Sequence, residues 1–425
     1  MAKPKKTHKK LKAVIMAAGE SSRFKPLSDN RHKSLTKIGG QPAILKTIEN
    51  LAKNGVSDII IIHAPGERQK FESALKGIGN KIQYAEQKNP KGTGNALKSA
   101  IHLINSDFIL MNASHEDSEK SLKKLLSGLS QKSLKLLTTE SKRPWEYAVV
   151  ELKGKKIKNI VEKPKPGDES SNLRTLGIYF IPEEFKKYIE RAPEGPYSLI
   201  DAFNMYAKDF GAESVPISEE PASIKYAFDM LDVITQFTNR QKRTIAKGAA
   251  ISKNAQLNGA VVVGRGTRIM ENAVIHGPVY IGENCFIGNN VVIRENSIIE
   301  NNVQLGTNTE VKHSHIGEGT HIHSGYVGDS VIGENCRVGA GFITGNRRID
   351  RGNIKFVLGD KIIDSQKTYL GCVIGDETKT GIYASTMPGT IIGSNCIIGS
   401  NTEVKGTIPA NSKVYSEKKI VIKLI

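Results

Sequence analysis

The chain has 425 residues, of which 38% are hydrophobic and 6% aromatic, with four cysteines and a formal net charge of +18. This length exceeds what one ordinary core holds, so we expect two or more domains. The cysteines form no CxxC pair, which argues against a disulfide framework or zinc knuckle, and no stretch approaches the ~20 apolar residues of a membrane span. These features predict a cytoplasmic protein.

The positive charge is densest in residues 3–12, which we predict to lie in a basic disordered tail at 1–12. Elsewhere lysines and arginines are dispersed, without the interleaved aromatic residues of a nucleic-acid platform. We therefore expect small phosphorylated or acidic substrates rather than nucleic acid.

Strand-like and helix-like segments alternate in the first half, at residues 13–17, 43–54, 58–63, 67–76 and 108–111. Such alternation predicts a Rossmann-like α/β domain with a mostly parallel sheet, which we assign to residues 13–232. Ligands of such sheets bind beyond the carboxyl ends of the strands. Residues 229–244 predict a connecting helix, and we assign 233–250 as the linker.

From residue 251 an aliphatic residue stands at every sixth position, without a gap from Ile251 to Val311. A strict period of six excludes an α-helix and predicts a hexapeptide-repeat parallel β-helix with three short strands per coil. We assign it to residues 251–410, followed by a tail at 411–425. The repeat is interrupted at 345–367, which predicts a loop that bulges from the coil. Small-residue positions of the repeats hold Cys285, Cys336 and Cys396, which we predict to fill the core.

Four short motifs accompany this architecture. Residues 14–33 (VIMAAGESSRFKPLSDNRHK) lead from a strand into a Gly-containing loop followed by Arg and Lys, residues 87–94 read QKNPKGTG, residues 161–164 read VEKP, and residues 323–326 read HSGY. Glycine lets backbone N–H groups approach phosphate oxygens, and the cations neutralise charge during phosphoryl-type transfer.

Together the halves resemble the two-domain sugar-1-phosphate nucleotidylyltransferases whose carboxyl half is a left-handed β-helix, over about residues 12–405. This family includes archaeal bifunctional enzymes and the bacterial N-acetylglucosamine-1-phosphate uridylyltransferase/glucosamine-1-phosphate acetyltransferase. The resemblance implies that the first domain joins a nucleoside triphosphate to a sugar phosphate, and that the second moves an acetyl group from acetyl-CoA to an amino-sugar phosphate. It also implies a homotrimer or a dimer of trimers.

In the first domain the resemblance assigns Arg23 and Lys33 to catalysis. It assigns the contacts with the nucleotide and sugar to Ala18, Gly19, Gln87, Gly92, Thr93, Glu162 and Lys163.

The first domain also departs from the family at positions that carry chemistry. Ser114 and Ser223 stand where the family has the carboxylates that hold Mg²⁺, and a hydroxyl cannot balance that cation as a carboxylate does. The loop has Ser21 for a second Gly and His32 for a Pro, and the sugar positions hold Ala148 and Thr175. We expect weak or lost nucleotidyl transfer, unless Glu116, Asp117 or Asp229 supplies a displaced ligand.

The second domain follows the family more closely. The resemblance makes His323 the general base toward the amine, consistent with an imidazole pKa near ~6.5. It also assigns Tyr326, Asn346 and Lys355 to the amino-sugar site and Ala340 to acetyl-CoA, whereas Gly352 replaces a family lysine. The neighbouring His313, His315 and His321 leave a metal site as an alternative, which we disfavour because strand side chains alternate in direction.

The predicted function is acetyl-CoA-dependent N-acetylation of an amino-sugar 1-phosphate, with weak or lost transfer from UTP or dTTP. One alternative is an active UDP- or dTDP-sugar pyrophosphorylase. Another is a non-catalytic ligand-binding regulator or assembly scaffold.

Overall fold

The computed structural model describes residues 10–113, 115, 118–127, 134–141, 143–218 and 224–423. The chain divides into two compact units: the first joins Met1–Glu20 with Pro42–Ala222, and the second joins Ser21–Gln41 with Ser223–Ile425. Most of the predicted basic tail, residues 1–9, lies outside the described residues. Within the described residues, no helix combines the length and apolar character needed to cross a bilayer.

The first unit is built on one sheet of nine strands, in which β5, β4, β1 and β6 are parallel and β10 runs antiparallel to its neighbours β6 and β7. In sheet order the strands are β5 (Lys81–Glu86), β4 (Asp58–His63), β1 (Lys12–Ala17), β6 (Phe108–Asn112), β10 (Leu173–Ile181), β7 (Leu134–Glu140), β11 (Ala212–Pro216), β9 (Lys156–Glu162) and β8 (Ala148–Lys153). The predicted α/β domain and its first three strands are confirmed.

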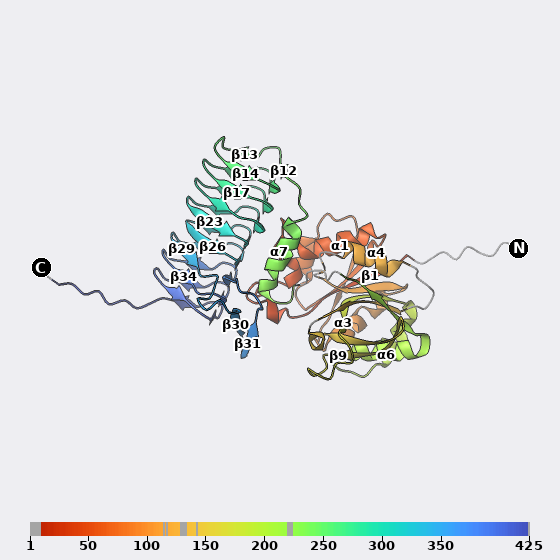
Figure 1. Ribbon diagram of the computed structural model, residues 1–425. Coiled ribbons are helices and arrows are strands. Elements are labelled where there is room, and N and C mark those ends of the chain that lie inside the picture. Colours follow the sequence, from red (N-terminus) through yellow and green to blue (C-terminus); the bar gives the residue numbers. More distant parts are fainter. Residues whose placement is uncertain are drawn as a thin grey trace. The chain divides into compact units, whose positions relative to one another are not determined.

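Helices cover both faces of this sheet, with α1 and α4 on one side and α3 and α6 on the other (Figure 1). The helix α1 is amphipathic because Ile44, Ile48 and Leu51 recur on one face and are buried. The helices are α1 (Ala43–Lys53), α2 (Arg68–Ala74), α3 (Thr93–Ser99), α4 (Glu119–Leu126), α5 (Lys186–Arg191) and α6 (Ser198–Phe210), with 3₁₀ turns η3 (Ile101–Leu103), η4 (Pro144–Glu146) and η5 (Glu183–Phe185).

The second unit is a β-helix whose coils form three parallel sheets, which we call faces A, B and C. Face A comprises β12 (Thr244–Ile245), β15 (Val261–Val263), β18 (Val279–Ile281), β21 (Ser297–Ile299), β24 (His315–Ile316), β27 (Val331–Ile332), β32 (Cys372–Ile374), β35 (Thr390–Ile392) and β38 (Thr407–Ile408). Face B comprises β13 (Ala250–Ile251), β16 (Arg268–Ile269), β19 (Phe286–Ile287), β22 (Gln304–Leu305), β25 (His321–Ile322), β28 (Arg337–Val338), β33 (Lys379–Thr380), β36 (Ile397–Ile398) and β39 (Lys413–Val414). Face C comprises β14 (Gln256–Asn258), β17 (Val274–His276), β20 (Val292–Ile293), β23 (Thr309–Lys312), β26 (Gly325–Gly328), β29 (Phe342–Thr344), β34 (Ser385–Thr386) and β37 (Glu403–Val404).

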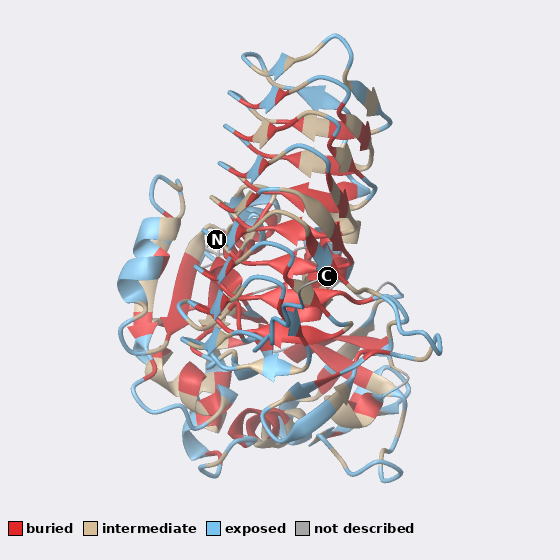
Figure 2. Ribbon diagram, turned by 90° about the vertical axis from the view of Figure 1, so that its left-hand side faces the viewer, coloured by how far each residue is buried: buried red, intermediate tan, exposed pale blue. Residues whose placement is uncertain are grey.

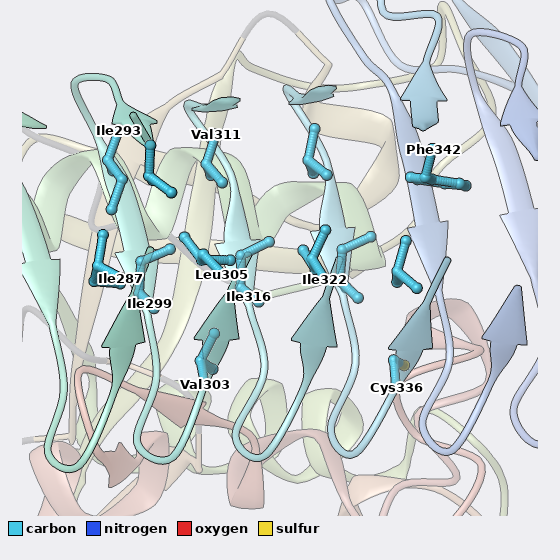
Figure 3. Packing of buried hydrophobic residues seen from close by; sticks show 14 of the residues in the cluster. Ile287, Ile293, Ile299, Val303, Leu305, Val311, Ile316, Ile322, Cys336 and Phe342 are labelled. Atoms are coloured by element: carbon cyan, nitrogen blue, oxygen red, sulfur yellow. The ribbon is translucent and has the colours of Figure 1, made fainter. Parts of the chain in front are cut away.

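The sixth-position aliphatic residues fill the interior of these coils, as the period predicts (Figure 3). Val261 pairs with Val279 and Val279 with Ser297, so three hexads make one coil. The predicted core cysteines are buried as well. Asparagines take the left-handed conformation at many corners, for example Asn290 at φ 57°, where their short polar side chain tolerates it.

The connecting helix is shorter than predicted, because α7 spans Met230–Thr238 after the 3₁₀ turn η6 (Ala227–Asp229). Face A already begins at Thr244. Thr244 pairs with Val262 and Ile245 pairs with Val263, and β-branched side chains of this kind favour a strand. The loop predicted at 345–367 is present between β29 and β32. It carries an antiparallel hairpin of β30 (Lys355–Leu358) and β31 (Lys361–Asp364).

Face A is covered by other parts of the second unit. The helix α7 packs against β21 and β24, and the outward-pointing Ile298 and Val331 are fully buried. The later coils accordingly show more buried residues than the first ones (Figure 2). Residues 21–41 also lie on this unit and contain η1 (Ser22–Phe24), η2 (Lys33–Leu35) and β2 (Lys37–Ile38), before β3 (Gln41–Pro42).

Candidate functional site

A polar cluster occupies the corner between faces C and A, on two successive coils. Asp329 is at its centre, with a side chain only 4% exposed. Its Oδ2 accepts from Asn346 Nδ2 at 2.6 Å and from Lys312 Nζ at 3.0 Å, and its Oδ1 accepts from His313 Nδ1 at 2.9 Å. Burial alone would raise the pKa of Asp329, but these donors outweigh burial and hold the pKa below its ordinary value.

Tyr326 joins this cluster through Asn346, whose Nδ2 also donates to the Tyr326 hydroxyl at 3.0 Å. Tyr326 lies on β26 and pairs with Ile343 of the neighbouring strand β29, and Asn346 stands two residues beyond the end of β29. Burial raises the pKa of Tyr326, so its hydroxyl stays protonated and can donate at neutral pH. The structure therefore brings together two of the residues that the sequence assigned to the amino-sugar site.

The same corner gathers cations that the sequence analysis missed. The Lys312 ammonium lies 4.7 Å and the Arg347 guanidinium 4.6 Å from the centre of the Tyr369 ring. Tyr369 follows the protruding loop, so the loop and the coil supply one charged surface. Two cations over an aromatic ring beside amide and hydroxyl groups can bind a phosphorylated sugar. Nothing in the sequence around Lys312, which lies within the hexapeptide repeats, indicates that it could bind a phosphate.

The remaining predicted residues of this half lie nearby in sequence, but no hydrogen bond joins their side chains to the cluster in the described part of the chain. His323 is an exposed residue just after β25, at the corner between faces B and C. Ala340 lies at the same corner one coil further on, where its carbonyl accepts from the Tyr383 amide at 2.8 Å. Lys355 is exposed on β30 of the hairpin.

The neighbouring histidines have separate surroundings. His313 bonds Asp329, whereas His315 is buried on face A with Nε2 3.2 Å from Glu300 Oε1. His321 points outward from face B, and burial together with the nearby Arg337 and His323 lowers its pKa. Within the described residues, no group of three or more His, Cys, Asp or Glu side chains could hold a metal ion.

In the first unit, the predicted nucleotide-binding residues follow the carboxyl ends of parallel strands. Ala18 and Gly19 come directly after β1, and Gln87 comes after β5. The Gln87 side chain is buried, and its Nε2 donates to the Gly92 carbonyl at 3.1 Å and to Asn95 Oδ1 at 2.8 Å. This anchors the loop that leads into α3.

The loop geometry before α3 requires glycine. Gly92 has φ +101°, and a Cβ there would lie 2.7 Å from the Pro196 carbonyl oxygen. Thr93 is exposed and is the first residue of α3. Glycine at position 92 thus lets Pro196 pack closely against the loop.

The predicted sugar-contacting pair lies at the end of β9 in the first unit. Burial raises the pKa of Glu162, and Lys163 Nζ lies 3.9 Å from its carboxylate. Lys163 adopts a left-handed backbone with φ 46°. The nearby Thr175, which stands in place of the family asparagine, is buried and has its hydroxyl 3.3 Å from that of Tyr179.

Both unusual residues of the Gly-containing loop have a structural role. Ser21 adopts the left-handed conformation with φ 52°, as a glycine would, and its hydroxyl lies 3.4 Å from the Lys33 amide. His32 is buried, which lowers its pKa to about 3, so the ring is neutral. Its Nδ1 accepts from the Ser34 amide and caps η2, the turn that presents Lys33. Ser21 and His32 therefore both support the local turns of this segment.

Lys33 lies in positively charged surroundings within the second unit. Its Nζ donates to the Ile224 carbonyl at 2.5 Å. Burial, with repulsion from Arg23 and Lys225, lowers the pKa of Lys33 to about 8, although Asp229 opposes the shift. A bound anion would balance this excess of positive charge.

Only one of the residues in question for Mg²⁺, Asp229, is among those that the structure describes. Ser114, Ser223, Glu116 and Asp117 lie outside the described residues. Asp229 is described, and its Oδ2 accepts from the amides of Lys225 at 2.9 Å and Tyr226 at 2.6 Å. This carboxylate caps η6, and burial raises its pKa. Within the described residues, Asp229 therefore belongs to no cluster of carboxylates that could hold Mg²⁺.

Comparison with known proteins supports both halves. Residues 12–216 match the nucleotidyl transferase family, and residues 260–295 and 371–406 match the bacterial transferase hexapeptide family. A protein of Methanococcus maripaludis named "Bifunctional protein GlmU" is 37% identical, with 96% of this chain and 98% of the relative covered.

Two further relatives extend the match. A protein of the same name from Methanocaldococcus jannaschii is 32% identical, with 97% of this chain and 99% of the relative covered. A "Bifunctional sugar-1-phosphate nucleotidylyltransferase/acetyltransferase" of Sulfurisphaera tokodaii is 31% identical, with 90% and 94% covered. With this identity over nearly its whole length, the chain belongs to the bifunctional GlmU family of transferases, in which a nucleotidyl transferase domain precedes hexapeptide repeats.

Proposed function

We propose that the protein transfers the acetyl group of acetyl-CoA to the amine of an amino-sugar 1-phosphate at its β-helix. The observation that carries this proposal is the hydrogen-bonded series Tyr326–Asn346–Asp329–Lys312, in which Tyr326 stands three residues after His323. Asp329 fixes the Asn346 amide and the Lys312 ammonium, and the Tyr326 hydroxyl is held by that amide. The series is rigid, polar and positively charged at its edge, as an amino-sugar phosphate site requires.

In the proposed reaction His323 takes a proton from the substrate ammonium, because only the free amine can attack a thioester. The amine nitrogen then bonds to the acetyl carbon and loses its second proton, the bond from that carbon to sulfur breaks, and the leaving thiolate takes up that second proton. Tyr326 and Asn346 orient the sugar, and Lys355, with Lys312 and Arg347, neutralises its phosphate. Ala340 lies along the path of acetyl-CoA.

The test is release of free thiol from acetyl-CoA in the presence of glucosamine 1-phosphate or galactosamine 1-phosphate. His323→Ala should lower kcat by about two to four orders of magnitude. His321→Ala, two positions away on the same coil, is the matched control and should retain activity. Equal thiol release by wild type and His323→Ala would refute the assigned base.

We infer that nucleotidyl transfer in the first half is weak or lost. The serines at 114 and 223 support this inference, because the family holds its metal with carboxylates there. Incubation with UTP or dTTP, Mg²⁺ and sugar 1-phosphates should therefore release pyrophosphate slowly or not at all.

Full nucleotidyl transfer is the second candidate function, favoured by Gly19, Arg23, Lys33 and Gln87. Rapid pyrophosphate release that Lys33→Ala abolishes would establish it. A protein that binds nucleotide and acetyl-CoA but shows neither activity would be the regulator or scaffold.

We further propose that the protein assembles as a trimer or dimer of trimers through faces B and C. Large apolar side chains on this surface are exposed, among them Ile343, Ile382, Tyr383 and Ile397. Hexapeptide coils bury such side chains between subunits. Light scattering of the eluting protein measures the mass, and a monomer at micromolar concentration would contradict the proposal.

A further inference from the structure

A row of acidic side chains runs along the corner between faces A and B. It consists of Glu300, Glu318, Glu334 and Asp376, which follow the successive face A strands β21, β24, β27 and β32. We call these four residues the acidic row. All of them bind the segment 21–41, which is far away in sequence and belongs to the same unit.

The segment contacts the row in strict order. The amides of Gly39 and Gly40 donate to Glu300, and Lys37 pairs with Glu318. Arg31 then bridges two coils, with one nitrogen 2.7 Å from Glu334 and another 2.9 Å from Asp376. One coil further, Ser394 Oγ donates to the Pro26 carbonyl at 3.2 Å, and the Ser394 amide donates to Asp29 at 3.3 Å.

Glu300 fixes the register of this contact. Its side chain is fully buried. One oxygen accepts the Gly39 amide at 2.8 Å and the other accepts the Gly40 amide at 2.6 Å. His315 Nε2 adds a third donor at 3.2 Å. A buried carboxylate is costly unless it is fully hydrogen-bonded, so a shift of the segment by one residue would unpair it.

The segment attached in this way carries most of the cations of the Gly-containing loop. Residues 21–41 contain five lysines and arginines but a single acid, Asp29. The acidic row engages Arg31 and Lys37. Within the described residues, no hydrogen bond or ion pair joins Arg23 or Lys33 to it. Lys33 is instead held by the Ile224 carbonyl in surroundings where other cations predominate.

We propose that the acidic row is a positioning device for nucleotide binding, in which β-helix carboxylates set the register of residues 21–41 and hence the places of Arg23 and Lys33. The proposal rests on the proposed function in one respect, which is the assignment of Arg23 and Lys33 as residues that bind the triphosphate. The hexapeptide coils then serve nucleotide binding in addition to the acetyl transfer, and their acids act through these two cations.

The experiment reverses one pair of charges in the full-length protein. Lys37→Glu and Glu318→Lys each place like charges in contact, and the double variant restores an opposite pair. We expect each single variant to bind UTP or dTTP roughly threefold to tenfold more weakly by calorimetry, with recovery in the double variant. Amide hydrogen exchange over residues 21–41 should rise and recover in parallel.

Glu283→Lys is the matched control, because Glu283 stands at the same corner on an earlier coil and pairs with Arg265 instead of the segment. It should leave nucleotide affinity unchanged. Thiol release from acetyl-CoA should be unchanged in all four variants, which shows that the coils remain folded.

Three results would overturn the proposal. Faster exchange without weaker nucleotide binding would make the row purely structural. Weaker binding that the double variant fails to restore would mean that the pairing is not the cause. If the wild-type protein bound neither UTP nor dTTP, the acidic row would have no nucleotide site to position, and the proposal would fail. Loss of acetyl transfer in the wild type would refute the proposed main function but not this one.

Discussion

Asp329→Asn tests how the polar cluster of the β-helix is built. The carboxylate accepts three donors: two at Oδ2, from Asn346 and Lys312, and one at Oδ1, from His313. Asparagine keeps one acceptor oxygen and replaces the other with an NH₂ group. If the oxygen stays toward Asn346 and Lys312, the NH₂ faces His313 Nδ1, which is also a donor.

The magnitude follows from this count. One hydrogen bond to a charged group is lost, at about 1.5–3 kcal/mol. The bond from Asn346 becomes a neutral one, and the bond from Lys312 keeps only its charged donor. We expect the free energy of unfolding to fall by about 2–4 kcal/mol. In acetyl transfer, KM for the amino-sugar phosphate should rise more than kcat falls, because Asn346 and Lys312 are the residues proposed to bind the substrate, whereas the proposed base makes no hydrogen bond to Asp329 within the described residues.

The pH dependence gives a second measure. The pKa of Asp329 is held below its ordinary value, so its stabilising contribution is present above that ordinary value and is lost as pH falls through the lowered one. The difference in stability between wild type and Asp329→Asn should therefore shrink below about pH 4.

Urea unfolding followed by circular dichroism measures the stability, and thiol release measures the kinetics. Asp360→Asn, at an exposed turn of the hairpin, is the control and should change neither. An Asp329→Asn protein with wild-type stability and wild-type KM would show that the cluster does not depend on the carboxylate.

Three further predictions concern single positions. Ser21→Gly should raise the free energy of unfolding by up to about 1 kcal/mol, because Ser21 has φ 52° and glycine adopts that conformation without strain; calorimetric unfolding checks this. Asn290→Ala should lower it by about 1–2 kcal/mol at a corner with φ 57°, whereas Asn290→Gly should be nearly neutral in the same urea assay. Triphosphate affinity should fall as pH rises from 7 to 9, since the pKa of Lys33 is about 8 and only its charged form attracts phosphate; an affinity that is flat over this range would exclude Lys33 from the binding site.

The period of six predicted the core of the β-helix residue by residue because every coil repeats one packing problem. Ile275, Ile287 and Ile293 are all fully buried, as their spacing requires. Strand and helix patterns likewise located β1, β4 and α1. The end of the connecting helix was less predictable, because the first coil has a weak pattern and only pairing with β15 makes Thr244 and Ile245 a strand.

The attachment of residues 21–41 to the β-helix could not be read from sequence. Glu300 and Gly39 are far apart in the chain, and neither stands in a motif that marks it. The role of Asp329 was not predicted either, because an acidic residue at a corner of a repeat is ordinarily exposed to solvent. Glu300 and Asp329 are each buried and each accept hydrogen bonds from several donors, and these surroundings arise only from tertiary structure.

The polar cluster lies where the repeat loses its regularity, and this has a physical cause. Regular coils advance by eighteen residues, as from Val279 to Ser297, but His315 pairs with Val331 after only sixteen. The shorter coils turn at His313 (φ 43°) and Asp329 (φ 48°), the corner where Asn296 (φ 58°) stands in a regular coil. At such a corner the side chain does not have to pack in the regular hexad pattern, so it can bind a polar neighbour instead.

Beyond the next turn the chain leaves the coil altogether for the loop that ends near Tyr369. A strict hexapeptide repeat has a place for core residues and turn residues but none for a site with several partners. A polar site with several partners therefore forms where the coils depart from the repeat. In sequence, a run of shortened coils followed by an insertion is the signal that indicates such a site.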